Sequence, residues 1–120
     1  MKPKIQKTGF GYVVVGEKRI EHDVVIRLNG SVEKRKKELS KAVYGTSHII
    51  SLEEAKHVFQ DGAELLIVGT GQSGLAELSP DAAAYFQKKK CTVELLPTPQ
   101  AIERWNEAKG AVIALLHVTC

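Results

Sequence analysis

The segment LLIVGTGQSG, residues 65–74, decides the fold of this 120-residue chain. Its first four residues form a continuous apolar run, which predicts a strand covered by other elements on both faces. Glycines at positions 69, 71 and 74 then predict a tight turn at the end of that strand, because glycine adopts positive φ without steric cost. A covered strand followed by such a turn is typical of α/β domains.

The segments after this turn alternate between helix and strand signals. Ser79 and Thr98 are each followed by a proline, and this cap-then-proline pattern predicts two helix starts. Strands are expected after the two helices, at residues 92–96 and 111–118, where apolar and β-branched residues cluster.

The segments before the turn continue the same alternation. Ser51 and Glu54 have the spacing of a capping box, in which the Ser hydroxyl and the Glu carboxylate each satisfy a free backbone N–H. A short strand at residues 48–50 precedes this helix. The expected order over residues 48–120 is therefore β-α-β-α-β-α-β, which predicts a mostly parallel sheet with helices packed on it.

The N-terminal third has strand signals only. Apolar and β-branched residues at 10–15 and 20–28 predict two strands, and Asn29-Gly30 is a strong turn signal. We therefore expect an antiparallel β-hairpin region over residues 1–31. Residues 32–44 contain the basic run KRKK and few apolar positions, so they predict only a short helix or an irregular loop.

Together these patterns predict one domain over residues 1–120, of the α/β class. Three layers are expected: a central mixed, mostly parallel sheet, its helices, and the N-terminal hairpin. Apolar residues make up 43% of the chain and charged residues 26%, as is usual for a globular protein.

Charge and hydropathy restrict the location and the partners. The net charge of +3 is far below that of a dedicated nucleic-acid binder. No apolar run approaches the ~18 residues needed to span a bilayer, and the first residues lack the apolar core of a secretory signal. We therefore expect a cytoplasmic protein that does not bind or span a membrane. Cys91 and Cys120 have neither redox-pair nor zinc spacing, which favours reduced, unpaired thiols.

The glycine turn is the first candidate site. Gly69, Gly71 and Gly74 match the GxGxxG pattern of dinucleotide-binding folds, but four residues separate the last glycine from the helix cap, whereas in those folds it lies inside the helix. No cofactor is therefore predicted. Two interpretations remain: an anion-binding turn of backbone N–H groups helped by the Thr70 and Ser73 hydroxyls, or simply a tight turn.

A second polar cluster, Thr46-Ser47-His48, lies on a predicted loop. It is either a turn held by its hydroxyls or a pocket wall beside the glycine turn. His117 lies two residues before Thr119 in the last strand, so both side chains point to one face. The four histidines lack metal-ligand spacing, so no metal site and no catalytic residue are assigned.

The second half of the chain resembles one known family. The segments that carry the resemblance occur in the family's order, and they are LIVGTG at 66–71, YFQKK at 85–89, TPQA at 98–101 before Trp105-Asn106, and HVTC at 117–120. The family is a small domain of unknown function that includes archaeal and bacterial proteins, the vertebrate adipogenesis-associated domain protein and mitochondrial respiratory complex I assembly factor 3. The similarity is strongest over residues 65–120 and looser over the N-terminal strands.

The resemblance implies a three-layer α/β domain and non-catalytic roles in complex assembly or regulation. It carries over no catalytic residue. The mitochondrial member has a targeting segment that is not seen here, so its organelle and its partner are not expected to transfer.

Three functions follow from the sequence. The first is a non-enzymatic interaction or assembly module, with an unidentified protein partner, acting through the glycine turn and the neighbouring strand ends; self-association is also open. The second is a small-molecule or nucleotide-binding protein, or an enzyme, in which the turn holds an anion and His48 or His117 acts as acid or base. The third, nucleic-acid binding through residues 34–37, has the least support.

Overall fold

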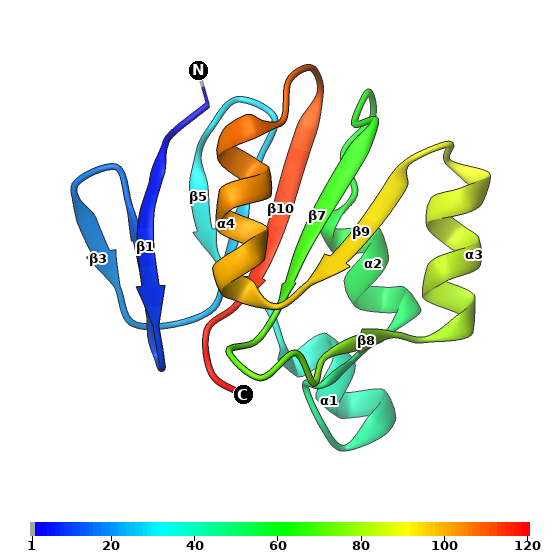
Figure 1. Ribbon diagram of the computed structural model, residues 1–120. Coiled ribbons are helices and arrows are strands. Elements are labelled where there is room, and N and C mark those ends of the chain that lie inside the picture. Colours follow the sequence, from blue (N-terminus) through cyan, green and yellow to red (C-terminus); the bar gives the residue numbers. More distant parts are fainter. Residues whose placement is uncertain (1) are drawn as a thin grey trace.

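The computed structural model describes residues 2–120, which form three sheets and four helices (Figure 1). Five strands make the central sheet, and they are β4 (Val24–Ile26), β5 (Val32–Lys34), β7 (Leu65–Thr70), β9 (Thr92–Leu96) and β10 (Val112–His117). Their order across the sheet is β5-β4-β10-β7-β9. β10 lies at the centre, and it is parallel to β7 and antiparallel to β4.

One face of the central sheet is covered by helix α4 (Thr98–Glu107) and a small antiparallel sheet. The small sheet consists of β1 (Ile5–Gly9), β2 (Tyr12–Val15) and β3 (Lys18–Ile20). Asn106 of α4 holds β1 in place, because its side-chain amide donates to the Ile5 carbonyl at 2.8 Å and accepts from the Ile5 N–H at 3.0 Å.

The opposite face is covered by helices α2 (Leu52–Val58) and α3 (Pro80–Lys88). A short helix, α1 (Glu38–Tyr44), and a two-stranded parallel sheet of β6 (Ile49–Ile50) and β8 (Glu77–Leu78) lie at the end of the molecule where β7 and β10 finish (Figure 1). The loops at this end carry most of the polar residues singled out from the sequence.

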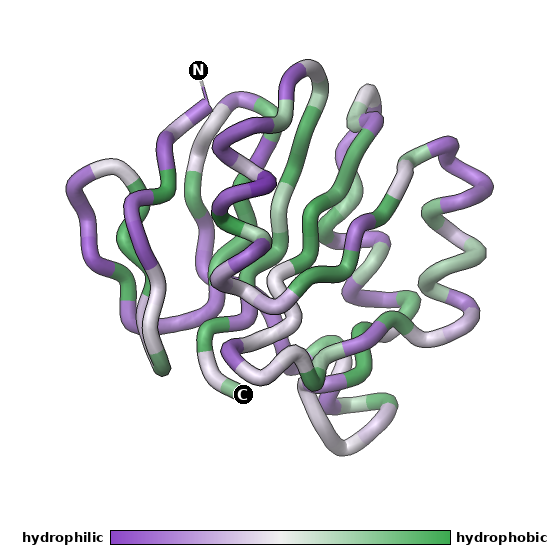
Figure 2. Tube along the Cα trace, in the orientation of Figure 1, coloured by the Kyte–Doolittle hydropathy of each residue, from purple (hydrophilic) through white to green (hydrophobic). Residues whose placement is uncertain are grey.

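The two apolar cores follow the alternation of side chains along the strands. In β7, Ile67 points into the core on the α4 side, whereas Leu66 and Val68 point into the core under α2 and α3. All three are at most 1% exposed. The continuous apolar colour of β7 and β10 in Figure 2 therefore reflects burial on both faces, as the sequence predicted.

The predicted three-layer α/β architecture is confirmed. One detail was wrong: the central sheet is evenly mixed rather than mostly parallel, since it has two parallel and two antiparallel pairings. The Asn29-Gly30 turn explains this, because it joins β4 and β5 as a hairpin on the edge of β10. Over residues 2–120, no helix has both the length and the apolar character needed to cross a bilayer.

The N-terminal third differs from the expected hairpin in its details. The predicted strand over residues 20–28 is two strands in different sheets, β3 and β4, and the chain crosses between them at residues 21–23. Residues 32–44 form β5 and then α1, where only a helix or loop was expected.

The structure confirms two of the three predicted helix caps. The hydroxyls of Ser51 and Ser79 accept from the N–H groups of Glu54 and Ala82, as predicted. Thr98 does not cap α4, although its position before a proline suggested it: the cap residue is Pro97, and no side chain caps this helix. The Thr98 hydroxyl instead bonds tertiary partners at the sheet end.

Candidate functional site

A buried polar network lies where β10 ends, and Asp23 is its centre. One carboxylate oxygen of Asp23 accepts from the Val118 N–H at 2.8 Å. The other accepts from Arg35 Nη1 at 3.0 Å and lies 2.8 Å from His117 Nδ1. Burial alone would raise the pKa of Asp23, but the hydrogen bonds from His117 and Val118 and the charge of Arg35 lower it to about 2. Asp23 is therefore an ionised acceptor at neutral pH.

Arg35 joins Asp23 to Glu54 of α2. Its guanidinium bonds both carboxylate oxygens of Glu54, at 2.6 and 2.9 Å, and donates a further bond to the Ser47 carbonyl at 2.9 Å. Burial would lower the pKa of Arg35, but its bonds to Glu54 and Asp23 raise it, so the guanidinium stays charged. Two carboxylates thus contact one buried cation, and Glu54 binds it with the two-bond geometry that arginine favours.

Glu54 does not complete the capping box predicted from the sequence. Its carboxylate accepts from the Ser40 hydroxyl at 2.5 Å and from Arg35, while the Ser51 N–H bonds Ser40 Oγ at 2.9 Å. A tertiary partner therefore replaces the local one, because a buried carboxylate is stabilised far more by a cation than by a backbone N–H. Among the described residues, every buried side-chain nitrogen and oxygen has a hydrogen-bond partner.

His117 is held in one orientation by this network. Because Asp23 is an ionised acceptor, the hydrogen-bond pattern assigns a proton to Nδ1 of His117. The Thr119 hydroxyl lies 3.2 Å from Nε2 of His117. The prediction that His117 and Thr119 point to one face is therefore correct.

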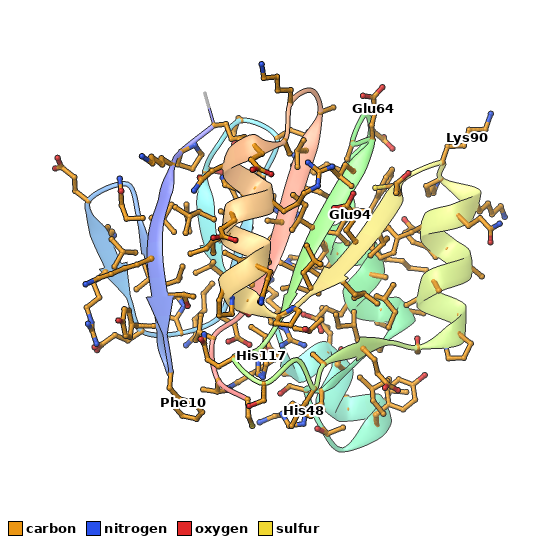
Figure 3. The ribbon with its side chains drawn as sticks, in the orientation of Figure 1. Phe10, His48, Glu64, Lys90, Glu94 and His117 are labelled. Atoms are coloured by element: carbon orange, nitrogen blue, oxygen red, sulfur yellow. The ribbon has the colours of Figure 1, made fainter. Side chains whose placement is uncertain are left out.

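His48 lies beside His117. Figure 3 shows the two labelled side chains together below the sheet end, and their ring centroids are 5.4 Å apart in an edge-to-face arrangement. Nε2 of His48 is 3.9 Å from the Cys120 thiol sulfur. The Thr46 hydroxyl accepts from the His48 N–H at 3.1 Å, which fixes the loop.

A pocket of about 210 Å³ opens beside these histidines. It is lined by charged, polar and small residues, namely Gly11, Glu21, His22, Asp23, Lys34, Arg35, Lys37, Ser47, His48, His117, Val118 and Thr119. The sequence expected a pocket between residues 44–48 and the glycine turn. The structure places Ser47 and His48 in a pocket wall, but within the described chain the opposite wall comes from the chain end at 117–119 and not from residues 69–74.

The glycine turn is wrapped around the last residues of the chain. The Gln72 N–H donates to the Thr119 carbonyl at 2.7 Å, and the Leu75 N–H donates to Cys120 O at 3.4 Å. The Gly71 N–H donates to Thr98 Oγ1 at 2.9 Å, and that hydroxyl donates to the His117 carbonyl at 2.6 Å. These N–H groups are used inside the protein, so an external anion at the turn would compete with them.

The other predicted residues of the turn differ in exposure. Gly69 is buried against Thr98, and Thr70 is 4% exposed at the end of β7. Gly74 packs near Pro97, and Ser73 is exposed. The N–H groups of Gly74 and Ala76 also bond inside the turn.

Sequence reasoning missed Asp23, Arg35 and Glu54 as members of the site. Arg35 lies inside a basic run that is usually a solvated face, and Glu54 has the spacing of a local cap. Asp23 directly precedes the apolar strand β4, and a charge at the edge of such a strand was the one available signal. The described part of the chain has no group of three or more His, Cys, Asp or Glu side chains arranged to hold a metal ion.

Comparison with known proteins places the chain in a defined structural group. A family described as "Protein of unknown function (DUF498/DUF598)" matches residues 5–117. A conserved hypothetical protein from Pyrococcus horikoshii OT3 is 35% identical, with a TM-score of 0.88 over 98% of this chain and 99% of that one. A structure named MT938 is 34% identical, with a TM-score of 0.83 over 99% of this chain and 100% of that one.

A more distant structure extends the fold comparison. A Bordetella pertussis protein described as a Mth938-like domain is 18% identical, with a TM-score of 0.63 over 97% of this chain and 85% of that one. At that identity the comparison supports the fold alone.

Proposed function

This chain belongs to the DUF498/DUF598 family of proteins of unknown function, and we propose that it is an interaction module that docks a partner protein at the end of the sheet where β7 and β10 finish. The docking surface consists of Phe10, Val43, Tyr44 and Leu75. These residues come from three separate segments, the β1–β2 turn, α1 and the glycine turn, which lie at the same end of the molecule (Figure 1).

The exposure of these apolar side chains is the observation that carries the proposal. Phe10 is 70% exposed, Val43 57%, Leu75 56% and Tyr44 39%. The only other large apolar side chain exposed among residues 2–120 is Leu95, on the edge strand β9. Scattered exposed apolar residues need no explanation, but several gathered at one end, with two aromatics among them, are typical of a docking site.

Charge around the docking surface favours an acidic partner. Lys36, Lys37 and Lys41 are exposed on and just before α1, next to Val43 and Tyr44. Complementary charge at the rim of an interface raises the association rate and selects among partners, while the apolar centre supplies most of the affinity. The partner surface is therefore expected to be apolar at its centre and acidic at its edge.

The resemblance to an adipogenesis-associated domain protein and to a respiratory complex assembly factor supports an assembly role. We place it in the cytoplasm, because both cysteines are free thiols, which suits a reducing compartment. A second copy of the chain is an allowed partner.

Affinity capture from native lysate tests the proposal with three forms of the protein. The test form is Phe10→Ser with Leu75→Ser, and the matched control is Leu95→Ser, which removes an exposed leucine of the edge strand β9 that is not one of the four docking-surface residues. We expect a stoichiometric partner with the wild type and with the control, and at least tenfold less with the test form. Recovery of bare wild-type protein, or equal capture by all three forms, would reject the proposal.

A second candidate function, small-anion binding, is favoured by the pocket beside His48 and His117. Lys34 and Lys37 help to line this pocket, and their ammonium groups favour an anionic ligand. A thermal-shift screen with phosphates and carboxylates tests this, since a ligand at 100 times its Kd stabilises by about 2.7 kcal/mol. A Lys37→Ala form that melts like the wild type with every anion would exclude the pocket as the binding site.

A further inference from the structure

Three side chains form a directed hydrogen-bond relay that ends in the pocket. Asp23 Oδ2 lies 2.8 Å from His117 Nδ1, and His117 Nε2 lies 3.2 Å from Thr119 Oγ1. The sheet itself brings the first two together. Leu116 pairs with Val24 in the antiparallel β10–β4 ladder, so the next residues outward, His117 and Asp23, meet across the strands.

The relay has one direction. Asp23 has no proton to give, because it also accepts from Arg35 and the Val118 N–H. When His117 is neutral, it donates through Nδ1 and accepts through Nε2, and the Thr119 hydroxyl is then the donor to Nε2. An acid that orients a histidine, which in turn accepts a hydroxyl proton, is the arrangement that activates the nucleophile in hydroxyl-dependent acyl transfer, whatever the fold.

We propose that Thr119 is the nucleophile of a site that hydrolyses small carboxylic esters, with His117 as the general base and Asp23 as the positioning residue. The Thr119 Oγ forms a bond to the ester carbonyl carbon, and its proton passes to His117 Nε2. The bond from the carbonyl carbon to the alcohol oxygen then breaks, and the alcohol leaves with that proton. Water attacks the acyl-threonine in the same way, which releases the carboxylic acid and restores the hydroxyl.

The surroundings define the class of ester. The pocket volume of about 210 Å³ is smaller than the roughly 300–1,000 Å³ of sites for drug-sized ligands, so a short acyl group fits. Lys34 and Lys37 on the rim favour an acyl group with a carboxylate at its far end, such as succinyl. His48 lines the same pocket and lies edge-on to His117, which makes it the side chain that we expect to stabilise the charge developing on the carbonyl oxygen.

The relay differs from a merely structural network in what it predicts for Thr119. The bonds of Asp23 to Arg35 and the Val118 N–H satisfy buried groups and need no hydroxyl at position 119. Thr119 is partly exposed and lines the pocket, so its hydroxyl can reach a ligand. A reagent that bonds covalently to an activated hydroxyl therefore separates the two roles.

Labelling with an alkyl fluorophosphonate tests the proposal. The Thr119 oxygen bonds to phosphorus, fluoride leaves, and the proton goes to His117. Intact-protein and peptide mass spectrometry should find one adduct, on Thr119, in the wild type. Thr119→Ser should keep the adduct, Thr119→Val should lose it, and His117→Gln should slow it at least 100-fold. Hydrolysis of 4-nitrophenyl succinate should likewise be kept by Thr119→Ser, lost in Thr119→Val and slowed in His117→Gln.

Two controls separate chemistry from folding and from the neighbouring thiol. Thr92→Val removes an exposed threonine at the start of β9 and should leave both readouts unchanged. Cys120→Ala should also keep the label on Thr119. Melting curves for Thr119→Val and Thr119→Ser establish that both fold.

No adduct on the wild type, an adduct on Cys120 instead, or equal hydrolysis by wild type and Thr119→Val would each overturn the proposal. These outcomes leave the docking test untouched, because that test changes Phe10 and Leu75 and the present one changes Thr119 and His117.

Discussion

Arg35 and Glu54 form a two-bond ion pair inside the protein, with Arg35 Nε 2.6 Å from one carboxylate oxygen and Arg35 Nη2 2.9 Å from the other. Their side chains are 1% and 0% exposed. The pair links the chain just after β5 to helix α2. A charge pair so far from water is stabilising only as a complete set, since each charge is costly to bury alone.

Replacing Arg35 by methionine should therefore destabilise the protein strongly. The substitution keeps much of the side-chain volume but leaves Glu54 and Asp23 buried without their cation, and breaking a buried pair costs about 3–5 kcal/mol. Urea unfolding at pH 7 measures the loss. Arg19→Met is the control: Arg19 pairs with Glu21 on the surface, with exposures of 56% and 70%, and its loss should stay below about 1 kcal/mol. Equal losses in the two variants would contradict the burial argument.

Asp23 should make the stability depend on pH between about 4 and 2. Its pKa is about 2 in the folded protein against 3.8 for an ordinary aspartate, so folding favours the ionised form. Asp23 therefore makes its full contribution to the free energy of unfolding above the pKa that it has in the unfolded chain. That contribution is lost as the pH falls through its pKa in the folded protein. The difference corresponds to about 2 kcal/mol.

The measurement is urea unfolding of the wild type and of Asp23→Asn from pH 7 to pH 2. The variant should be less stable at pH 7. The difference in unfolding free energy between the wild type and the variant should then narrow by about 2 kcal/mol as the pH is lowered to 2. A gap that stays constant with pH would show that Asp23 does not titrate as its contacts imply.

Gly71→Ala should loosen the last residues of the chain. Gly71 has φ of +104°, and a Cβ there would lie 2.5 Å from the Cys120 backbone. The clash adds to the backbone strain, and we expect a loss of about 1–3 kcal/mol. Amide hydrogen exchange at Gln72 and Leu75 should become faster, because both N–H groups bond the chain end.

Gly16→Ala is the matched control for Gly71. Gly16 also has positive φ, at +61°, but a Cβ there would meet no atom within 4 Å. It should cost only the strain of the left-handed conformation, about 1–2 kcal/mol, and leave exchange at Gln72 and Leu75 unchanged. If the two variants had the same effect on exchange at these amides, the close packing at Gly71 would not be what holds the chain end.

The two thiols should react at different rates with a disulfide reagent such as DTNB. Cys91 is 4% exposed and burial raises the pKa of its thiol, so little thiolate is present or accessible. Cys120 is partly exposed. One equivalent should react quickly in the native protein and map to Cys120, and the second should react only on unfolding. Fast reaction of both thiols without denaturant would contradict the placement of Cys91.

The residues that sequence analysis placed correctly are those whose signals are local. The Ser51 and Ser79 caps were predictable because each hydroxyl bonds an N–H three residues ahead. His117 and Thr119 were placed on one face because side chains alternate along a strand.

The errors arose where a distant partner replaced a local one. Thr98 has the sequence pattern of a helix cap, yet its hydroxyl bonds the Gly71 N–H and the His117 carbonyl. Glu54 has the spacing of a capping box, yet it bonds Arg35. A residue whose local and distant options compete cannot be assigned from its neighbours in the sequence.

The amino-acid sequence by itself determined the layers of this protein, since apolar periodicity, helix caps and glycine turns act over a few residues. Only the tertiary structure decided the site, because its members are joined by bonds such as those of Asp23 to Arg35 and to His117, which span 12 and 94 residues of chain. Charged groups this far apart in sequence form strong, specific pairs only when the packing of the sheets excludes water around them. In water the attraction between two charges is too weak to favour one partner over another.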